Sequence, residues 1–434
     1  MGGSPGVTDP PPTLIPPIVV NEVLSRTDVP PPTDSIELFN PTMHSADLSG
    51  WFITDAFNTP QKFRIPNGTT ISAGGFRVFT ESDFNPVPGS PPSFALSSLG
   101  DEAWLFSGDA QTNLTGYVHG FRFGAAENGV SFGRCLTSVG QEDFVAQLIR
   151  TLGASNAGPL VGPMVISEIQ YHPSSTLAAQ VTQFTPMQRL TAQQTQAVAA
   201  TAETLKFIEL QNITSHSLAL FDPVTPTNTW RLRGDANCDF PTNITLGPGA
   251  VLLVVSFDPA TNTDALAAFR SAYALGLDVP IYGPWSGTLS NSGACVTIEK
   301  PDVANLDTIP YILVDAVCYG ASLPWPPAAD GVGSSLQRLV ANYYGNDPEN
   351  WFADSPTPGI GSAIILPPRL AINAAGEITW PTQPAGFVLL MSESPTRPMP
   401  WPQADVTGLT EQNGYFKLTV PLTGVNRFYR LFKP

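Results

Sequence analysis

The sequence predicts an all-β protein, and three observations support this prediction. Apolar and polar residues alternate with a period of two, most clearly in SIELFNPTMHSADLSGWFIT at Ser35–Thr54. Glycine (37 residues) and proline (45 residues) are abundant while charged residues make up 13%, which favours many short strands joined by turns. The alternating pattern returns at Lys206–Leu232, where KFIELQN precedes SLAL and TWRL.

Ser35–Thr54 contains a strand with one apolar face, a turn, and a second strand headed by Trp51. Ile53 follows this tryptophan by two residues and therefore lies on the same face, as Leu232 does after Trp230. We therefore predict that both tryptophans are buried structural anchors.

Five sequence blocks recur in the same order, which predicts a tandem duplication. The first block is the one just described, in its two copies. The other four pair Ile18–Leu24 with Met164–Tyr171, Phe63–Asp83 with Asp239–Asp258, Phe94–Asp109 with Gly287–Asp302, and Tyr117–Cys135 with Ile312–Leu339.

The order of these blocks resembles the lamin tail domain family. The shared motifs are an NE strand, IELFN, Gly-Trp-x-hydrophobic, Phe-x-x-Pro-x-Gly with Gly-Gly, and Gly-Asp-x-hydrophobic. The family has an immunoglobulin-like β-sandwich fold and also occurs, often repeated, in secreted bacterial proteins. The resemblance covers Ile18–Gly158 and Pro163–Gly359, and it implies two tandem immunoglobulin-like β-sandwiches. We expect seven to nine strands in each, with the departures of the second copy confined to its loops.

Composition divides the chain into four parts. Prolines at 10–12 and 16–17 favour an extended, polyproline-like arm over 1–17. The first sandwich is assigned to 18–158, and the second, with helical insertions, to 163–362. After Pro367-Pro368, five short alternating runs predict a small β-sandwich module at 367–434. This module resembles the C-terminal immunoglobulin- or fibronectin-like modules of large secreted bacterial proteins.

Two helices are expected in the second sandwich. Met187–Leu205 carries apolar residues near one face at helical spacing. Asp258–Gly276 places Leu266, Phe269 and Tyr273 three to four residues apart, with Gly276 in the position of a helix-ending glycine.

Charge and hydropathy argue against nucleic-acid binding and against a membrane-spanning segment. The net charge is −16 and no basic cluster occurs, so nucleic-acid binding is disfavoured. No run of about 18 apolar residues exists, so no membrane span is expected. The N-terminus lacks the apolar core of a signal peptide. For an extracellular or cell-surface protein, this implies that the signal was removed or that the chain begins at a processed boundary.

The four cysteines are Cys135, Cys238, Cys295 and Cys318. No CxxC pair occurs, so a zinc site is disfavoured. Cys295 and Cys318 lie on consecutive predicted strands, where they can face each other across a hairpin. Two interpretations remain. Either two cysteines of the second copy form a disulfide, or these cysteines are buried free thiols.

One candidate metal site emerges, and no other cofactor is expected. Asp235, Asn237 and Asp239 have the oxygen spacing of the first half of a calcium-binding EF-hand loop. The sixth position is Phe240 where that loop needs glycine, and the twelfth is Leu246 where it needs glutamate. Any calcium site here would therefore be a weak surface site.

No catalytic residues are assigned. Gly129–Gly133 satisfies G-x-S-x-G around Ser131, but Arg134-Cys135 continue a strand where a nucleophile elbow needs a helix. The four histidines are scattered without metal-ligand spacing, and no acid–base set is complete.

We therefore interpret the chain as a non-catalytic extracellular structural or adhesive protein that acts through sandwich faces and edges. Its expected partners are other protein subunits, cell-surface components or copies of itself. The apolar Leu14 and Ile15 of the arm are the predicted assembly residues. One alternative is a subunit of a surface filament. Another is a carbohydrate-binding or accessory region of a secreted hydrolase, with candidate exposed tryptophans Trp104, Trp230, Trp285, Trp325 and Trp401.

Overall fold

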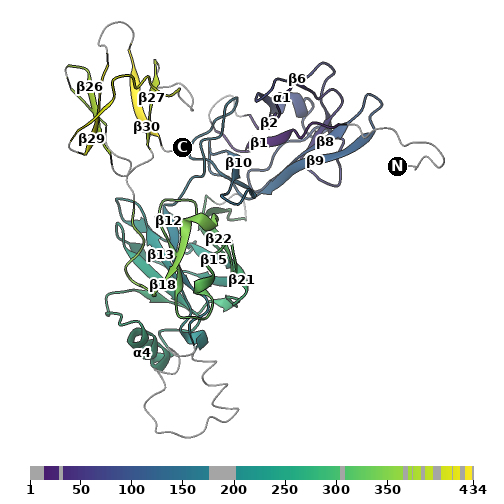
Figure 1. Ribbon diagram of the computed structural model, residues 1–434. Coiled ribbons are helices and arrows are strands. Elements are labelled where there is room, and N and C mark those ends of the chain that lie inside the picture. Colours follow the sequence, from purple (N-terminus) through teal and green to yellow (C-terminus); the bar gives the residue numbers. More distant parts are fainter. Residues whose placement is uncertain are drawn as a thin grey trace, which may run out of the picture. The chain divides into compact units, whose positions relative to one another are not determined.

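The computed structural model describes residues 14–28, 33–174, 202–303, 308–364, 370–373, 375–382, 387–393, 402–412, 414–420 and 426–432. Its contacts divide the chain into two compact units, each built almost entirely of β-strands (Figure 1). The first unit is Met1–Cys135 with Phe144–Gly158. The second is Leu136–Asp143 with Pro159–Pro434, and it includes the C-terminal module.

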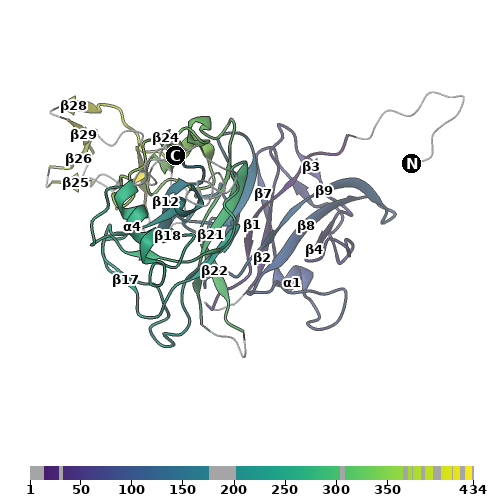
Figure 2. The same ribbon diagram turned by 90° about the horizontal axis from the view of Figure 1, so that it is seen from below.

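The first sandwich has two principal sheets, of orders β11-β10-β1-β2-β7 and β5-β4-β8-β9 (Figure 2). The first sheet contains β1 (Val19–Leu24), β2 (Ser35–Phe39), β7 (Phe76–Thr80), β10 (Phe132–Leu136) and β11 (Glu142–Ala146). The second contains β4 (Phe52–Thr54), β5 (Phe63–Arg64), β8 (Asp101–Gly108) and β9 (Leu114–Phe123). A two-stranded pair, β3 (Ala46–Asp47) and β6 (Thr70–Ile71), and the short helix α1 (Glu81–Phe84) complete it.

Period-two alternation builds the core between these sheets. Along β8, Ala103 and Leu105 are fully buried, whereas Trp104 and Phe106 point to the outer face and are half-buried. Strand β4 follows Trp51, which is 5% exposed and belongs to the same core.

The second sandwich has the sheet orders β19-β18-β13-β12-β23-β24 and β20-β16-β15-β21-β22 (Figure 1). The first sheet contains β12 (Met164–Gln170), β13 (Phe207–Asn212), β18 (Val251–Val255), β19 (Ile281–Tyr282), β23 (Ser335–Arg338) and β24 (Trp351–Asp354). The second contains β15 (Arg231–Gly234), β16 (Ala236–Asp239), β20 (Ser286–Gly287), β21 (Gly293–Pro301) and β22 (Tyr311–Gly320). The remaining elements are β14 (Leu218–Ala219), β17 (Thr245–Leu246) and two 3-10 helices, η1 (Pro327–Ala329) and η2 (Pro348–Asn350).

The expectation of seven to nine strands is wrong for the second sandwich, whose principal sheets hold six and five strands. The two-residue strands β19 and β20 extend the sheets at their edges. Strands this short carry no alternation that a sequence pattern can detect.

Helix α4 (Thr263–Ala272) lies within the predicted Asp258–Gly276 but is shorter. Asn262 caps it by accepting a hydrogen bond from the N–H of Ala265, so the helix starts at Thr263, five residues after Asp258. Gly276 does not end it, because the chain leaves the helix at Tyr273 and Ala274 takes the positive φ of 52°. The helix covers part of the outer face of the six-stranded sheet through Phe269. The predicted helix Met187–Leu205 lies almost wholly outside the described residues.

The C-terminal module has its own small core, which includes Ile378, Trp380, Leu389 and Leu418. Its four-stranded sheet has the order β25-β26-β29-β28, and β27 pairs with β30. These strands are β25 (Ala371–Ile372), β26 (Glu377–Pro381), β27 (Val388–Ser392), β28 (Thr410–Gln412), β29 (Tyr415–Thr419) and β30 (Phe428–Phe432). In the described parts of the chain, no helix has the length and apolar character needed to cross a membrane.

Candidate functional site

A pair of buried glutamates lies on the outer face of the first sandwich. Glu22 on β1 is directly opposite Glu37 on β2, and both side chains are 0% exposed. Glu22 accepts hydrogen bonds from the Ser131 hydroxyl at 2.5 Å, from the Thr151 N–H at 2.9 Å and from the Thr151 hydroxyl at 2.8 Å. Each oxygen of this carboxylate therefore has at least one donor.

Glu37 is held by donors of the same kind. Its carboxylate accepts a hydrogen bond from the Asn21 amide at 2.7 Å and one from the Gly153 N–H. Residues 151–153 follow β11, and because they donate to outward-facing side chains, they cover this part of the sheet. We call residues 151–153 the covering segment of the first sandwich.

The second sandwich carries a second buried pair. Glu168 on β12 is opposite Glu209 on β13, and these side chains are 2% and 1% exposed. Glu168 accepts hydrogen bonds from the Ser335 hydroxyl at 2.5 Å, from the Thr357 N–H at 2.9 Å and from the Thr357 hydroxyl at 3.1 Å.

Glu209 accepts from the Ser167 hydroxyl and from the Gly359 N–H, both at 2.6 Å. Residues 357–359 follow β24 and form the covering segment of the second sandwich. In both sandwiches the first glutamate of the pair directly follows a shift in the register between the two strands.

The two pairs have the same donor pattern. One serine and one threonine donate to the first glutamate, and a glycine two residues after that threonine donates to the second. The corresponding residues are Glu22 and Glu168, Glu37 and Glu209, Ser131 and Ser335, Thr151 and Thr357, and Gly153 and Gly359.

An asparagine network also occurs in both sandwiches. The Asn40 amide donates to the carbonyls of His44, Ile71 and Ser72 at 2.8–3.1 Å. The Asn212 amide donates to the carbonyls of His216, Leu246 and Gly247 at 2.9–3.0 Å. Each asparagine thus ties the end of one strand to the turn that follows it and to the end of a more distant strand, β6 or β17.

Burial dominates the electrostatics of the glutamate pairs. Desolvation raises the pKa of Glu37 to about 7 and that of Glu168 to about 7, although hydrogen bonds to the carboxylates oppose the shift. The neighbouring glutamate of each pair raises these pKa values further. Burial also raises the pKa of Glu209.

These pairs anchor the covering segments. Neighbouring carboxyl groups that include one with a raised pKa are a feature of acid–base sites. Here, however, serine, threonine and backbone donors of the same chain occupy the carboxylate oxygens. The arrangement therefore holds each covering segment in place, because its release would leave buried carboxylates without hydrogen-bond donors.

Each of the three calcium candidates has a hydrogen-bonding or ionic partner within the protein. The Asp235 carboxylate accepts from the Cys295 N–H at 2.7 Å, and the Asp239 carboxylate pairs with the Arg233 guanidinium at 2.6 Å. The Asn237 amide donates to a backbone carbonyl. Among the described residues, no group of three or more His, Cys, Asp and Glu side chains is placed to hold a metal ion.

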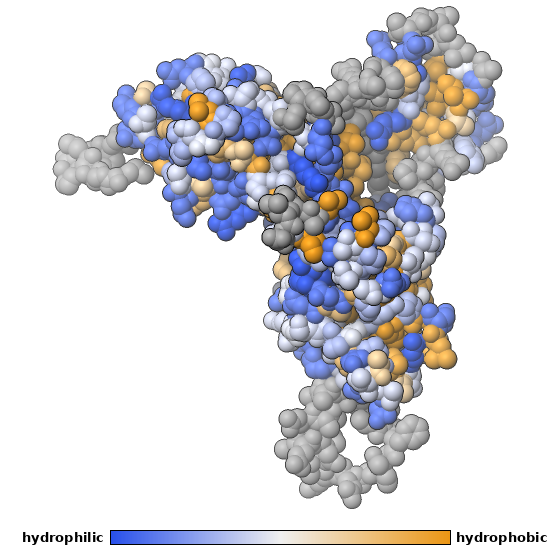
Figure 3. All heavy atoms as spheres, turned by 180° about the vertical axis from the view of Figure 1, so that it is seen from behind, coloured by the Kyte–Doolittle hydropathy of each residue, from blue (hydrophilic) through white to orange (hydrophobic). Residues whose placement is uncertain are grey.

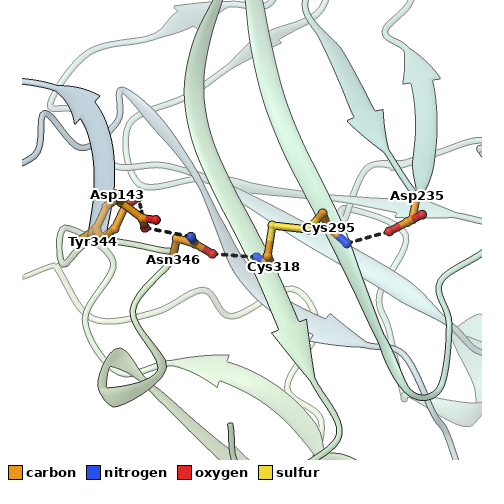
Figure 4. The surroundings of a disulfide bond; sticks show 6 residues. All are labelled: Asp143, Asp235, Cys295, Cys318, Tyr344 and Asn346. Atoms are coloured by element: carbon orange, nitrogen blue, oxygen red, sulfur yellow. Dashed lines mark hydrogen bonds between the residues drawn. A yellow bond between two sulfur atoms is a disulfide. The ribbon is translucent and has the colours of Figure 1, made fainter. Parts of the chain in front are cut away.

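Cys295 and Cys318 form a disulfide between directly opposite positions of β21 and β22 (Figure 4). Both cysteines are exposed. The Cys318 N–H donates to the Asn346 side chain at 2.9 Å, and the Asn346 amide donates to Asp143 of the same unit at 2.9 Å. The disulfide thus joins the two longest strands of the second sandwich. Cys135 and Cys238 are not disulfide-bonded.

Most candidate surface tryptophans lie in a core. Trp230, Trp285 and Trp325 are 4–7% exposed. Trp104 is half-buried on the outer face of β8, where its indole N–H donates to Glu102 at 2.8 Å and its ring contacts the 43%-exposed Phe57. Trp401 lies outside the described residues.

Sequence reasoning identified Ser131 only as part of a discounted nucleophile pattern, and it missed all four glutamates. Ser131 is fully buried next to β10, and its hydroxyl donates to Glu22. The available signal was the recurrence of one glutamate in each first strand and one in each IEL stretch.

The two predicted assembly residues differ in environment. Leu14 is 93% exposed, whereas Ile15 packs against the core of its own sandwich. Residues 1–13 of the arm lie outside the described residues.

Fold and site define an all-β chain of immunoglobulin-like sandwiches. Residues 11–119 match the family model described as Lamin Tail Domain. No curated protein matches the chain. One solved structure is similar, a DUF4876 family protein from Bacteroides thetaiotaomicron VPI-5482. It is 12% identical, with a TM-score of 0.24, over 74% of this chain and 92% of that one.

Proposed function

We propose that this chain is a non-catalytic extracellular structural or adhesive protein that assembles with copies of itself through the edges and faces of duplicated sandwiches. The observation that carries this proposal is the recurrence of the glutamate pair with its serine, threonine and glycine donors. A duplicated arrangement that only anchors the chain favours a structural repeat over a catalytic centre.

Two further features support an extracellular location and surface contacts. The Cys295–Cys318 disulfide is exposed, and disulfides persist in oxidising environments. On the visible face in Figure 3, hydrophobic residues gather in several patches among hydrophilic ones. Exposed apolar patches are typical of interaction surfaces.

Deletion of residues 1–16 tests the assembly. We expect the full chain to form oligomers that the deletion abolishes. Because the deletion also removes Ile15 from the core of its own sandwich, the melting temperature should fall while unfolding stays cooperative. Mass is measured by light scattering at matched concentrations. An oligomer that persists unchanged after the deletion would reject the role of the arm.

A second candidate function is carbohydrate binding at the outer face of β8. An open groove of about 510 Å³ there is lined by Phe57, Asn58, Glu102 and Arg122, next to Trp104. Aromatic rings and hydrogen-bonding side chains together suit a sugar. Sedimentation with insoluble cellulose and chitin tests this function. Retention lost in Phe57→Ala would favour it, and no retention of the unaltered chain on either polymer would reject it.

A further inference from the structure

The first sandwich leaves one edge of its five-stranded sheet open. The edge strand is β7, which pairs with β2 on one side only. The Glu81 N–H donates to the Asp34 carbonyl at 2.9 Å, so hydrogen-bonded pairs fall on alternate residues along β7. The N–H and C=O of Val78 therefore point away from β2. Within the described residues, no other group binds them.

The second sandwich closes the corresponding edge with its own chain. Leu253 on β18 lies opposite the second glutamate of its pair, as Val78 does on β7. Strand β19 runs parallel to β18 with Ile281 next to Leu253, and the Leu253 N–H donates to the Pro280 carbonyl at 2.9 Å.

The closing segment has a simple sequence. Pro280–Pro284 reads PIYGP, which places two apolar residues between prolines. Ile281 packs against the outer cluster below α4, and Tyr282 packs against the main core. Prolines at both ends suit a short edge strand, because they stop further pairing.

The first sandwich has a segment with the same proline spacing but without the apolar pair. Pro88–Pro92 reads PGSPP, with Gly89 and Ser90 in place of the isoleucine and tyrosine. Both residues are exposed, and the Ser90 N–H bonds within the loop to the Val87 carbonyl at 3.1 Å. Without apolar side chains to bury, this loop adds no strand to β7.

The N-terminal arm supplies a matching segment. Pro12–Pro16 reads PTLIP, with the same proline spacing, with Leu14 at the position of Tyr282 and with Thr13 at that of Ile281. Leu14 is 93% exposed in its own chain, so its burial elsewhere is favourable. The prolines restrict the arm, which lowers the entropy lost when it docks.

We propose that Thr13–Ile15 of one copy adds a short parallel strand to β7 in the first sandwich of a second copy. The Val78 N–H would donate to the Pro12 carbonyl, and the Leu14 N–H would donate to the Val78 carbonyl. In the same chain, β2 separates β1 from β7, and Ile15 already packs against its own core. The edge is therefore filled by another copy. This inference rests on the assembly proposed above and names its acceptor surface.

Val78→Pro in the full chain tests the acceptor edge, because it removes an outward N–H while leaving the bonds between β7 and β2 intact. We expect Val78→Pro and Leu14→Asp each to reduce the mass measured by light scattering to that of a single chain. Leu277→Asp is the matched control for loss of an exposed leucine, since Leu277 is 91% exposed in the second unit. It should leave the mass unchanged.

A cysteine pair tests the same contact without relying on proline. Chains with Thr13→Cys are mixed with chains with Val78→Cys under mild oxidation, and a disulfide-linked dimer is expected. The control partner is Val118→Cys on β9, an edge strand of the other sheet, where the valine is 39% exposed. Equal crosslinking to the control, or none to Val78→Cys, would overturn the proposal.

The outcomes separate this inference from the proposed function. If Leu14→Asp dissociates the oligomer while Val78→Pro does not and no crosslink forms, the arm docks elsewhere and only the β7 site is rejected. If the unaltered chain is a single chain at every concentration, both proposals are rejected.

Discussion

At the scale of single residues, four buried glutamates distinguish this protein from a generic β-sandwich. The alternation of apolar and polar residues predicted that polar residues lie on the outer face of each strand, and the structure agrees. The alternation did not predict that other parts of the chain cover this face. The donors to Glu22 include Thr151, which lies 129 residues further along the chain. No local pattern contains information about a cover so distant in sequence.

Stability should fall as the pH rises from 5 to 8. Burial raises the pKa of Glu37 and of Glu168 to about 7, from ordinary values of 4.5. The folded chain therefore keeps protons that the unfolded chain releases, and this stabilisation is lost as the pH rises through about 7. Carboxyl groups whose pKa is lowered, such as Asp47, change the free energy of unfolding only at more acidic pH.

Urea denaturation at pH 5, 6, 7 and 8 measures this dependence. Glu168→Gln should flatten the slope, because the substituted side chain does not titrate. Glu349→Gln, at an exposed position of the second sandwich, is the control and should keep the slope. Stability that increases with pH across this window would contradict the account.

Removal of one donor should weaken the first sandwich. Thr151→Val deletes the hydroxyl that donates to Glu22 and preserves the shape of the side chain. Because a buried acceptor loses its donor, we expect the free energy of unfolding to fall by about 1–3 kcal/mol. Thr151→Ser retains the hydroxyl and should lose less. Equal stability of the valine and serine variants in chemical denaturation would refute a role for this bond.

At the scale of elements, strands with clear alternation were predictable, because one face packs in a core. The facing cysteines of β21 and β22 could be anticipated for the same reason, as neighbouring strands place them opposite. The ends of α4 could not be predicted, because Asn262 caps its start and the chain leaves the helix before Ala274, ahead of the expected Gly276. Strand β19 also escaped prediction, since it pairs in parallel through only two residues.

Trp51, which directly precedes β4, is predicted to stabilise the core of the first sandwich. The ring is 5% exposed, so Trp51→Ala should cost about 3–5 kcal/mol of unfolding free energy, as deletions of large aromatic side chains do. Met43→Ala in the same sandwich is the control, since Met43 is 86% exposed. An unchanged melting temperature for Trp51→Ala would place the ring outside the core.

At the scale of the whole molecule, net charge opposes assembly. Each chain carries −16, so copies repel one another at low ionic strength. The contact proposed at β7 consists of backbone hydrogen bonds and apolar burial, neither of which depends on opposite charges. Added salt should therefore increase the oligomer fraction, because it screens the repulsion.

Self-association is the central claim, and sedimentation velocity of the full chain over a dilution series at 0.15 M and 0.5 M salt tests it most directly. The account predicts species at multiples of 46.2 kDa that dissociate on dilution, with more oligomer at the higher salt concentration. A single 46.2 kDa species at every concentration and both salt concentrations would contradict it.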